Sequence, residues 1–352
     1  MKKIIAILLA LTLALSLFAA CGSGAKAENG ELNLYTWEGM FPQEVLDGFT
    51  AETGIKVNYS SFDYDETMLA KLEAANGGDY DVVIADDYII ELAINENLVQ
   101  KLDKSKLTNI GNVNPLYQGQ FYDAANEYTV PYGAGIQTIV YNPDMVSTPI
   151  NGYADLWNAA LKDNVGIIAN YRVINGMALK IMGESYNTTD TATIAAAGKK
   201  LLELAPNIRL IKDDNLQDDL VSGEVAATVI YTSQVTMAML ANPNLKVVFP
   251  SDGIGFGIMA QFIPVNAPNV DAAHQFINYI LQPEVAAQCF EALGFYCTTL
   301  AAEPYINEDF KSFLTLPENI STENMEMIQN VTEDADAAHV LAWTEFKNAT
   351  GK

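Results

Sequence analysis

Apolar residues follow two different periods in the first third of the chain, and these periods alternate. Short runs that are mostly apolar predict strands, and apolar residues spaced three or four apart predict helices. The predicted strands are 32–36, 55–60 and 79–85, and the predicted helices are 42–53, 63–75 and a third near Tyr88. This order of strands and helices predicts a parallel sheet with helices on both faces.

Candidate ligand-binding side chains follow two of these strands. In open α/β sheets, ligands bind beyond the carboxyl ends of the strands. Trp37 follows the first predicted strand, and Asp86, Asp87 and Tyr88 follow the third. We expect these side chains to face a ligand. The alternatives are that the two rings only pack and that the two aspartates cap the next helix.

The segment from Tyr128 to Asn142 is predicted to connect two halves of the protein. Two β-branched and aromatic runs, 128–132 and 137–142, flank Gly133-Ala134-Gly135, where a chain can bend at little steric cost. Another set of strands and helices follows. A cleft is therefore expected where the two sets meet, and we expect the function to reside there.

The remainder of the chain continues the alternation. Helices are predicted at 153–161, 173–182, 191–204, 233–240, 270–281, 283–293 and 337–346, and strands at 165–170, 225–231, 246–250 and 259–265, the last after a polar turn at 251–257. These elements provide a second sheet with its own helices.

The N-terminus has the pattern of an export signal. Lys2-Lys3 precedes the apolar run 4–18, which is too short to span a bilayer comfortably. Ala19-Ala20-Cys21-Gly22 resembles a bacterial lipoprotein signal, in which the cysteine is lipidated and becomes the mature N-terminus. We predict a signal peptide at 1–20 and a lipidated tether at 21–30, which anchors an extracytoplasmic protein to the membrane. Ordinary cleavage, with Cys21 discarded or free, is the alternative.

Composition narrows the functional classes. The 352 residues include 44 acidic and 19 basic ones, giving a formal charge of −25. Such a charge repels nucleic acid and attracts cations, although an acidic surface also keeps an exported protein soluble. Two histidines and no Cys-x-x-Cys give no metal-site pattern, and no cofactor is predicted. Cys289 and Cys297 permit a disulfide in an exported protein without requiring one.

Sequence motifs for catalysis are absent. The chain has no Gly-x-Ser-x-Gly, no His-Glu-x-x-His and no histidine near a candidate serine or cysteine nucleophile. Glu38 and Asp86 resemble a glycosidase carboxylate pair, but the position of Glu38 beside Trp37 suits ligand binding equally well. We therefore predict no catalytic residues.

Five stretches in order carry a family resemblance: Tyr35-Thr36-Trp37-Glu38, 49–57, Tyr80-Asp81-Val82-Val83, 98–107 and Asn187-Thr188-Thr189-Asp190. Over residues 32 to 302 the chain resembles the bacterial spermidine/putrescine-binding proteins of ABC transporters. The resemblance implies an α/β two-lobe clamshell with mixed, mostly parallel sheets, helices on both faces and three interlobe crossings. It also implies a monomer that captures a small cationic solute, delivers it to a membrane permease and performs no chemistry.

The resemblance also implies domain boundaries. Lobe one would comprise 31–134 and 258–303, and lobe two would comprise 135–257 and 304–352. The lobes would close about a hinge at Gly133, Gly135 and Gly257.

The implied ligand-binding positions keep only part of the family pattern, in which carboxylates hold ammonium groups and rings line the methylene chain. These positions are Trp37, Glu38, Asp86, Tyr88, Asn170, Tyr231, Met259 and Phe295. The family's carboxylates are replaced by Asn170, Val173 and Met259, and two of its tryptophans by Ala134 and Gly257. A buried ammonium without a carboxylate partner is costly, so lobe two's half of the cleft is expected to be more neutral. Glu38 and Asp86 are new carboxylates on the lobe-one side.

The ligand implied by this pattern is a polyamine or a related cationic amine. One alternative is a monoamine with an amide or aromatic end that faces Asn170 and Tyr231. Another is a zwitterion whose carboxylate meets Arg172. A further alternative is that the protein reports ligand occupancy to a signalling partner instead of serving transport.

Overall fold

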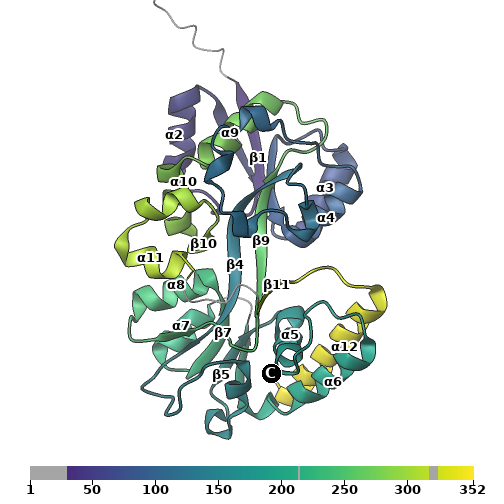
Figure 1. Cartoon of the computed structure of the whole chain (residues 1–352), viewed down its shortest axis with the longest axis vertical. Helices are drawn as coiled ribbons and strands as arrows, with labels where there is room; N and C mark the ends of the chain where they lie inside the picture. Colours follow the sequence, from purple (N-terminus) through teal and green to yellow (C-terminus); the bar gives the residue numbers. More distant parts are fainter. Residues whose placement is uncertain (1–29, 213–214, 317–323) are drawn as a thin grey trace, which may run out of the picture.

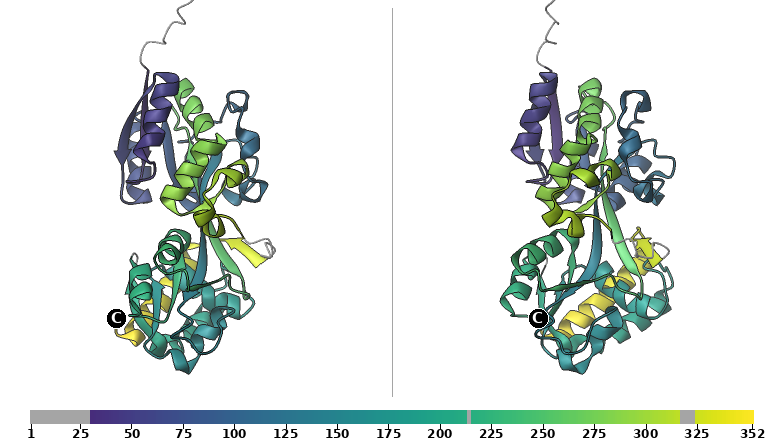
Figure 2. Two further views of the ribbon diagram at one scale, coloured as in Figure 1. Left: turned by 90° about the vertical axis from the view of Figure 1, so that its left-hand side faces the viewer. Right: turned by 60° about the vertical axis from the view of Figure 1, so that its left-hand side comes forward.

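A computed structural model describes residues 30–212, 215–316 and 324–352, so the predicted signal peptide and Cys21 lie outside the described residues. The described chain forms two lobes that meet at a narrow waist (Figures 1 and 2). Strands β4 (Thr129–Tyr141) and β9 (Ile254–Phe262) run through this waist and contribute to both lobes. The predicted two-lobe α/β clamshell is confirmed.

Lobe one contains a sheet with both faces buried, because adjacent residues of its strands alternate between two apolar cores. On β3, Val82 and Ile84 belong to one core, and Val83 and Ala85 belong to the other. Strand β1 pairs in parallel with both β2 and β3. Helices α2 and α9 cover the first face, and α3 and α4 cover the second. The bounds are β1 Glu31–Thr36, α2 Gln43–Thr53, β2 Lys56–Ser61, α3 Asp65–Ala75, β3 Val82–Asp86, α4 Asp87–Asn95 and α9 Val270–Ile280.

Lobe two is built in the same way around its own core. Strand β5 pairs in parallel with β6 and β7, while β7 and β8 are antiparallel to the second half of β4. The C-terminal helix α12 packs on α5 and α6, as Figure 1 shows at the lower right. The bounds are β5 Val165–Ile168, α5 Tyr171–Ile181, α6 Thr191–Leu202, β6 Ile208–Lys212, α7 Leu216–Ser222, β7 Ala227–Tyr231, α8 Thr232–Ala241, β8 Lys246–Val248 and α12 Glu333–Thr350.

The two lobes share one antiparallel ladder at the waist. The strand order is β2-β1-β3-β9-β4-β7-β5-β6, which places β9 and β4 at the centre. In the β4–β9 register Gly133 lies opposite Met259, and Gly135 lies opposite Gly257. The three predicted hinge glycines therefore come together at one level of this ladder, where the predicted lobe boundaries 134/135 and 257/258 also fall. Their role as a hinge stays a prediction.

The glycines of the waist lie within a continuous strand and close to neighbouring side chains. Strand β4 runs without a break through Gly133 and Gly135, and neither residue has a positive φ. A Cβ atom on Gly133 would lie 2.8 Å from Cε of Met259 and 3.6 Å from Cβ of Phe295. The continuous strand β4 agrees with the prediction of one strand through residues 133–135. The bend expected at these glycines stays a prediction.

Two local predictions were wrong. The polar turn expected at 251–257 ends sooner, because β9 begins at Ile254. Gly255 belongs to that strand, and a Cβ atom there would lie 2.4 Å from Oε1 of Gln137. The helix expected at 153–161 is two 3₁₀ helices, Tyr153–Trp157 and Ala159–Leu161. Asn158 separates them with an extended backbone, and its side chain accepts a hydrogen bond from the Ala160 amide.

The chain crosses the waist a third time near its C-terminus. Helix α10 (Pro283–Leu293) and β10 (Tyr296–Cys297) lead to α11 (Glu308–Leu314), which packs against α10 of lobe one and α8 of lobe two. Strand β11 (Met325–Met327) then pairs in parallel with β9 before the chain enters α12. Cys289 and Cys297 are both buried, and they do not form a disulfide bond. Within the described residues, no helix is long and apolar enough to cross a membrane.

Candidate functional site

A cleft of about 700 Å³ lies between the lobes and is lined by both of them and by the crossing segments. Seven predicted ligand-binding residues line it: Trp37, Asp86, Tyr88, Asn170, Tyr231, Met259 and Phe295. The hinge residues Gly135 and Gly257 also line the cleft. Glu38 does not. Its side chain is exposed, and its carboxylate accepts a hydrogen bond of 3.3 Å from Ser61 Oγ at the end of β2.

The lobe-one wall combines aromatic rings with carboxylates. Trp37 is half-buried and packs against Phe62 with 5.0 Å between ring centroids. The Tyr88 hydroxyl donates a 3.1 Å hydrogen bond to Oε1 of Glu66. Phe295 lies over Gly135, where a Cβ atom would be 3.6 Å from the ring. Both Trp37 and Tyr88 therefore have packing or hydrogen-bonding partners within lobe one and still present surface to the cleft.

Among the described residues, five carboxylates line the cleft, and all of them belong to lobe one. They are Asp63, Asp65, Glu66, Asp86 and Asp87. The first three surround the N-terminus of α3, and the last two are at the N-terminus of α4. Asp63, Asp65 and Glu66 were not among the predicted ligand-binding residues, although they follow β2 just as Trp37 follows β1. Applying the carboxyl-end rule to the second strand would have found them.

Asp65 is the most unusual member of this acidic cluster. Its side chain is only 5% exposed, and its Oδ1 atom has no hydrogen-bond partner. Burial raises the pKa of Asp65, and the neighbouring Asp86 and Glu66 carboxylates raise it further. Burial also raises the pKa of Asp86, with Asp87 the largest charged contributor. The groups that act on these two carboxyls include no cation, and the two carboxyls are hydrogen-bonded to each other.

Asp87 has a structural role that differs from the expected helix cap. The N-cap of α4 is Asp86, whose side chain makes no capping hydrogen bond, and Asp87 is the first helical residue. Oδ2 of Asp87 accepts a 2.7 Å hydrogen bond from the Ile258 amide of β9. Burial raises the pKa of Asp87 to about 7, although this hydrogen bond acts in the opposite direction. Asp87 therefore joins α4 to the second crossing strand.

The lobe-two wall is polar and largely uncharged. Oδ1 of Asn170 accepts a 3.1 Å hydrogen bond from the Val173 amide and so caps α5. Nδ2 of Asn170 donates to the Tyr231 hydroxyl at 3.0 Å. Asn170 therefore orients Tyr231 at the cleft, and its own carbonyl oxygen is already used. Val173 and Ser233 complete this part of the wall.

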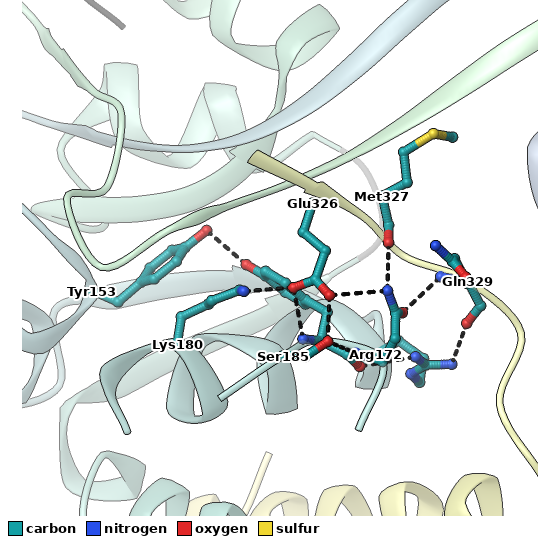
Figure 3. A network of polar contacts seen from close by, with 9 residues as sticks. Tyr153, Arg172, Lys180, Ser185, Glu326, Met327 and Gln329 are labelled. Atoms are coloured by element: carbon teal, nitrogen blue, oxygen red, sulfur yellow. Dashed lines mark hydrogen bonds and ion pairs between the residues drawn. The ribbon is translucent and has the colours of Figure 1, made fainter. Parts of the chain in front are cut away.

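Arg172 is the single basic residue among the described residues that line the cleft, and it holds the third crossing in place. Its Nη1 and Nη2 atoms donate hydrogen bonds of 3.1 Å to the backbone oxygens of Gln329 and Tyr186 (Figure 3). Its Nε atom is buried without a partner. Burial lowers the pKa of Arg172. The guanidinium thus attaches residue 329 to lobe two instead of standing open to a ligand.

Glu326 on β11 is the centre of the same network. Its carboxylate is bound by Lys180 Nζ, by the Ser185 hydroxyl and by the Tyr186 amide (Figure 3). Burial acts to raise the pKa of Glu326, but these donors outweigh it and the pKa is lowered. Beyond this anchor, Asn330 donates to the Tyr88 backbone oxygen and to Glu91 Oε2 in lobe one, at 3.1 and 2.8 Å. The third crossing therefore links both walls of the cleft.

Comparison with known proteins agrees with this architecture. Residues 44–316 match the model of a family described as bacterial extracellular solute-binding protein. The chain belongs to this family of bacterial extracellular solute-binding proteins. Its members are solute-binding proteins and not enzymes.

Individual relatives of this solute-binding protein cover most of its length. The spermidine/putrescine-binding periplasmic protein of Salmonella typhimurium is 36% identical over 336 residues, which is 95% of each chain. That of Escherichia coli K12 is 36% identical over 82% of this chain and 83% of its own. The crystal structure of the spermidine/putrescine substrate-binding protein PotD from Streptococcus pneumoniae superposes with a TM-score of 0.85. It has 29% identity and covers 92% of this chain and 100% of its own. The resemblance drawn from the sequence is confirmed.

The acidic cluster predicts an unusual pH dependence. In the unfolded chain these aspartates ionise near pH 3.8, but in the folded, ligand-free protein their pKa values are raised. The native state therefore holds more protons than the unfolded state above pH 3.8, and stability falls as the pH rises through about 7. We expect the melting temperature of ligand-free protein to drop by about 5 °C or more between roughly pH 5 and pH 8.

The matched control for this melting experiment is Asp65→Asn, which removes one of the titrating carboxyls. Its melting temperature should drop by less than that of the native protein over the same pH interval. Melting is measured by circular dichroism. An equal drop in the melting temperatures of the two proteins would contradict the assignment of the effect to this cluster.

The Glu326 network predicts a large effect of one exchange on stability. Glu326→Ala leaves Lys180 without its anionic partner at a site where the two side chains are 14% and 25% exposed. We expect a loss of about 2–3 kcal/mol in the free energy of unfolding, measured by urea denaturation. Glu308→Ala removes an exposed ion pair with Lys311 and should change the free energy of unfolding by less than about 0.5 kcal/mol. Equal effects of the two exchanges would argue against an anchoring role for Glu326.

Proposed function

We propose that this chain is the lipid-anchored solute receptor of an ABC importer and that it captures a polyamine or a related cationic amine in the interlobe cleft. The observation that carries the proposal is the placement of five carboxylates on the lobe-one wall, with Arg172 the only basic residue among those described around the cleft. Buried carboxylates without protein counter-charges are suited to a cationic ligand. The relatives named as spermidine/putrescine-binding proteins support the same ligand class.

The aromatic rings of the cleft suit the rest of such a ligand. Trp37 and Tyr88 adjoin the acidic cluster, and Phe295 and Tyr231 line the cleft further on. Rings of this kind pack against methylene groups and attract a neighbouring ammonium by about 0.5–2 kcal/mol each. A micromolar dissociation constant requires about 8 kcal/mol of binding free energy. One ion pair and several aromatic contacts can supply this after the entropy cost of ordering the ligand is subtracted.

The proposed mechanism is closure of the lobes on the ligand. The hinge would lie at Gly133, Gly135 and Gly257, where β4 and β9 cross the waist. A ligand that contacts both walls binds the closed form more tightly than the open form. It stabilises the closed form by that difference in binding free energy. The closed, monomeric receptor would present its cargo to the permease outside the cytoplasm, held to the membrane by lipid on Cys21, and would perform no chemistry.

The position of Arg172 argues against a zwitterionic ligand. A ligand carboxylate at lobe two would need a donor with spare capacity, and Nη1 and Nη2 of Arg172 already bind backbone oxygens of residues 329 and 186. On the lobe-one side, the same carboxylate would meet the acidic cluster. Amines without a carboxylate therefore fit the cleft better than amino acids do.

Calorimetric titration tests this function. The chain from residue 22 onward, stripped of bound ligand by unfolding and refolding, is titrated with putrescine, spermidine, spermine and butylamine. At least one amine is expected to bind with Kd below about 10 μM, while a neutral diamide gives no heat. Trp37→Ala should weaken binding about tenfold because the ring contact is lost. Tyr305→Ala, which removes an exposed ring outside the cleft, should not. Absence of heat with every amine, in folded ligand-free protein, would overturn the proposed ligand class.

A further inference from the structure

The acidic cluster contains one position that is prepared for a single cation. Asp65 lines the cleft and is only 5% exposed. Its Oδ1 atom has no hydrogen-bond partner. A buried, unpartnered carboxylate oxygen is costly unless a ligand supplies a donor. The Asp86 carboxyl is its electrostatic neighbour across the gap between α3 and α4. These two groups come from different elements and meet only in the folded lobe.

The other acidic and titratable groups around Asp65 and Asp86 already have partners or stand in solvent. Asp87 accepts the hydrogen bond from the Ile258 amide, and Glu66 accepts one from the Tyr88 hydroxyl. Asp63 is exposed at the entrance to the cleft. Asp65 and Asp86 are hydrogen-bonded to each other, but no cation acts on either of them and Oδ1 of Asp65 has no donor. They are therefore the two carboxyls of the cluster that a ligand cation could compensate, beside the rings of Trp37 and Tyr88.

The opposite wall has the reverse character. No carboxylate of lobe two is among the described residues that line the cleft, and Arg172 contributes a positive charge there. Asn170 has used its carbonyl oxygen to cap α5 and its amide to hold Tyr231. A second ammonium placed at this wall would lose its hydration without gaining an anion. An uncharged group that forms hydrogen bonds, such as an amide, meets Ser233, Gln137 and Tyr231 without that cost.

We propose that Asp65 and Asp86 form the seat for one ammonium group of the ligand, and that the ligand end that reaches lobe two is uncharged and polar. The preferred cargo is then an amine with one charged end and one amide end, such as a mono-acylated diamine. This inference rests on the proposed function, namely capture of a cationic amine in this cleft, and it specifies how charge is distributed along the cargo.

The test compares two ligands with the same four-carbon chain. N-acetylputrescine carries one ammonium and one amide, whereas putrescine carries two ammonium groups. The same ligand-free protein is expected to bind N-acetylputrescine about tenfold more tightly than putrescine by calorimetry, because only putrescine leaves an unpaired cation at lobe two. Diacetylputrescine, which has no charge, should not bind.

Two matched exchanges test the seat itself. Asp65→Asn is expected to weaken N-acetylputrescine binding about 30-fold or more. Asp47→Asn changes an exposed aspartate of α2, in the same lobe but outside the cleft, and should weaken it less than about threefold. The melting temperature of the ligand-free variant at pH 8 shows whether a loss of binding is due to unfolding. Asp65→Asn removes a buried unpaired charge, so it should not lower this temperature.

A third exchange tests the opposite wall by gain of function. Asn170→Asp keeps a residue that caps helices well and adds a carboxylate to lobe two. It should narrow or reverse the preference for N-acetylputrescine over putrescine.

The outcomes distinguish this inference from the function on which it rests. Tighter binding of putrescine by the native protein, or unchanged affinity in Asp65→Asn, would overturn the inference and leave amine capture intact. Failure of every amine to bind would overturn the proposed function as well.

Discussion

The antiparallel pairing of β4 with β9 is the constraint on which the rest of the structure depends. These two strands are the centre of the sheet order, and each continues from one lobe into the other. Their register decides which side chains face the cleft at the waist, since Gly135 lies opposite Gly257 and Gly133 opposite Met259. The third crossing adds to this ladder through β11, which pairs with β9. Strand β3 of lobe one, strand β7 of lobe two and strand β11 of the third crossing each pair directly with β9 or β4.

Side chains lie close beside the glycines of this ladder. A Cβ atom on Gly257 would lie 3.4 Å from Oδ2 of Asp87, the oxygen that binds the next amide of β9. A Cβ atom on Gly133 would meet the end of Met259. Glycine here allows lobe-one side chains to pack directly on the backbone of the crossing strands. Because side chains pack so closely on β4 and β9 at these glycines, a small change in the geometry of the two strands would also change the shape of the cleft.

Much of the fold could be predicted from the sequence, because the periods of apolar residues report local structure directly. Helix α2 and strand β3 came from such patterns, and the resemblance to a family supplied the three crossings. The errors arose where tertiary contacts decide: Gly255 looks like a turn residue but belongs to a strand beside Gln137, and Asn158 divides a helical pattern into two 3₁₀ turns. Strand β6 was not predicted.

The candidate site was harder to predict, since proximity across elements is not encoded in spacing. In the sequence, Asp65 has the pattern of an ordinary acidic residue in the first turn of a helix, a position that favours carboxylates. Only the packed lobe shows that it is buried with Oδ1 unpaired beside Asp86. Glu38 is the opposite case, because it adjoins Trp37 in sequence yet its carboxylate meets Ser61 outside the cleft. Uncompensated carboxylates in a receptor disfavour a closed, dry cleft until a cation enters. Under the proposed function, the cost of burying Asp65 and Asp86 is thus what makes closure depend on the cargo.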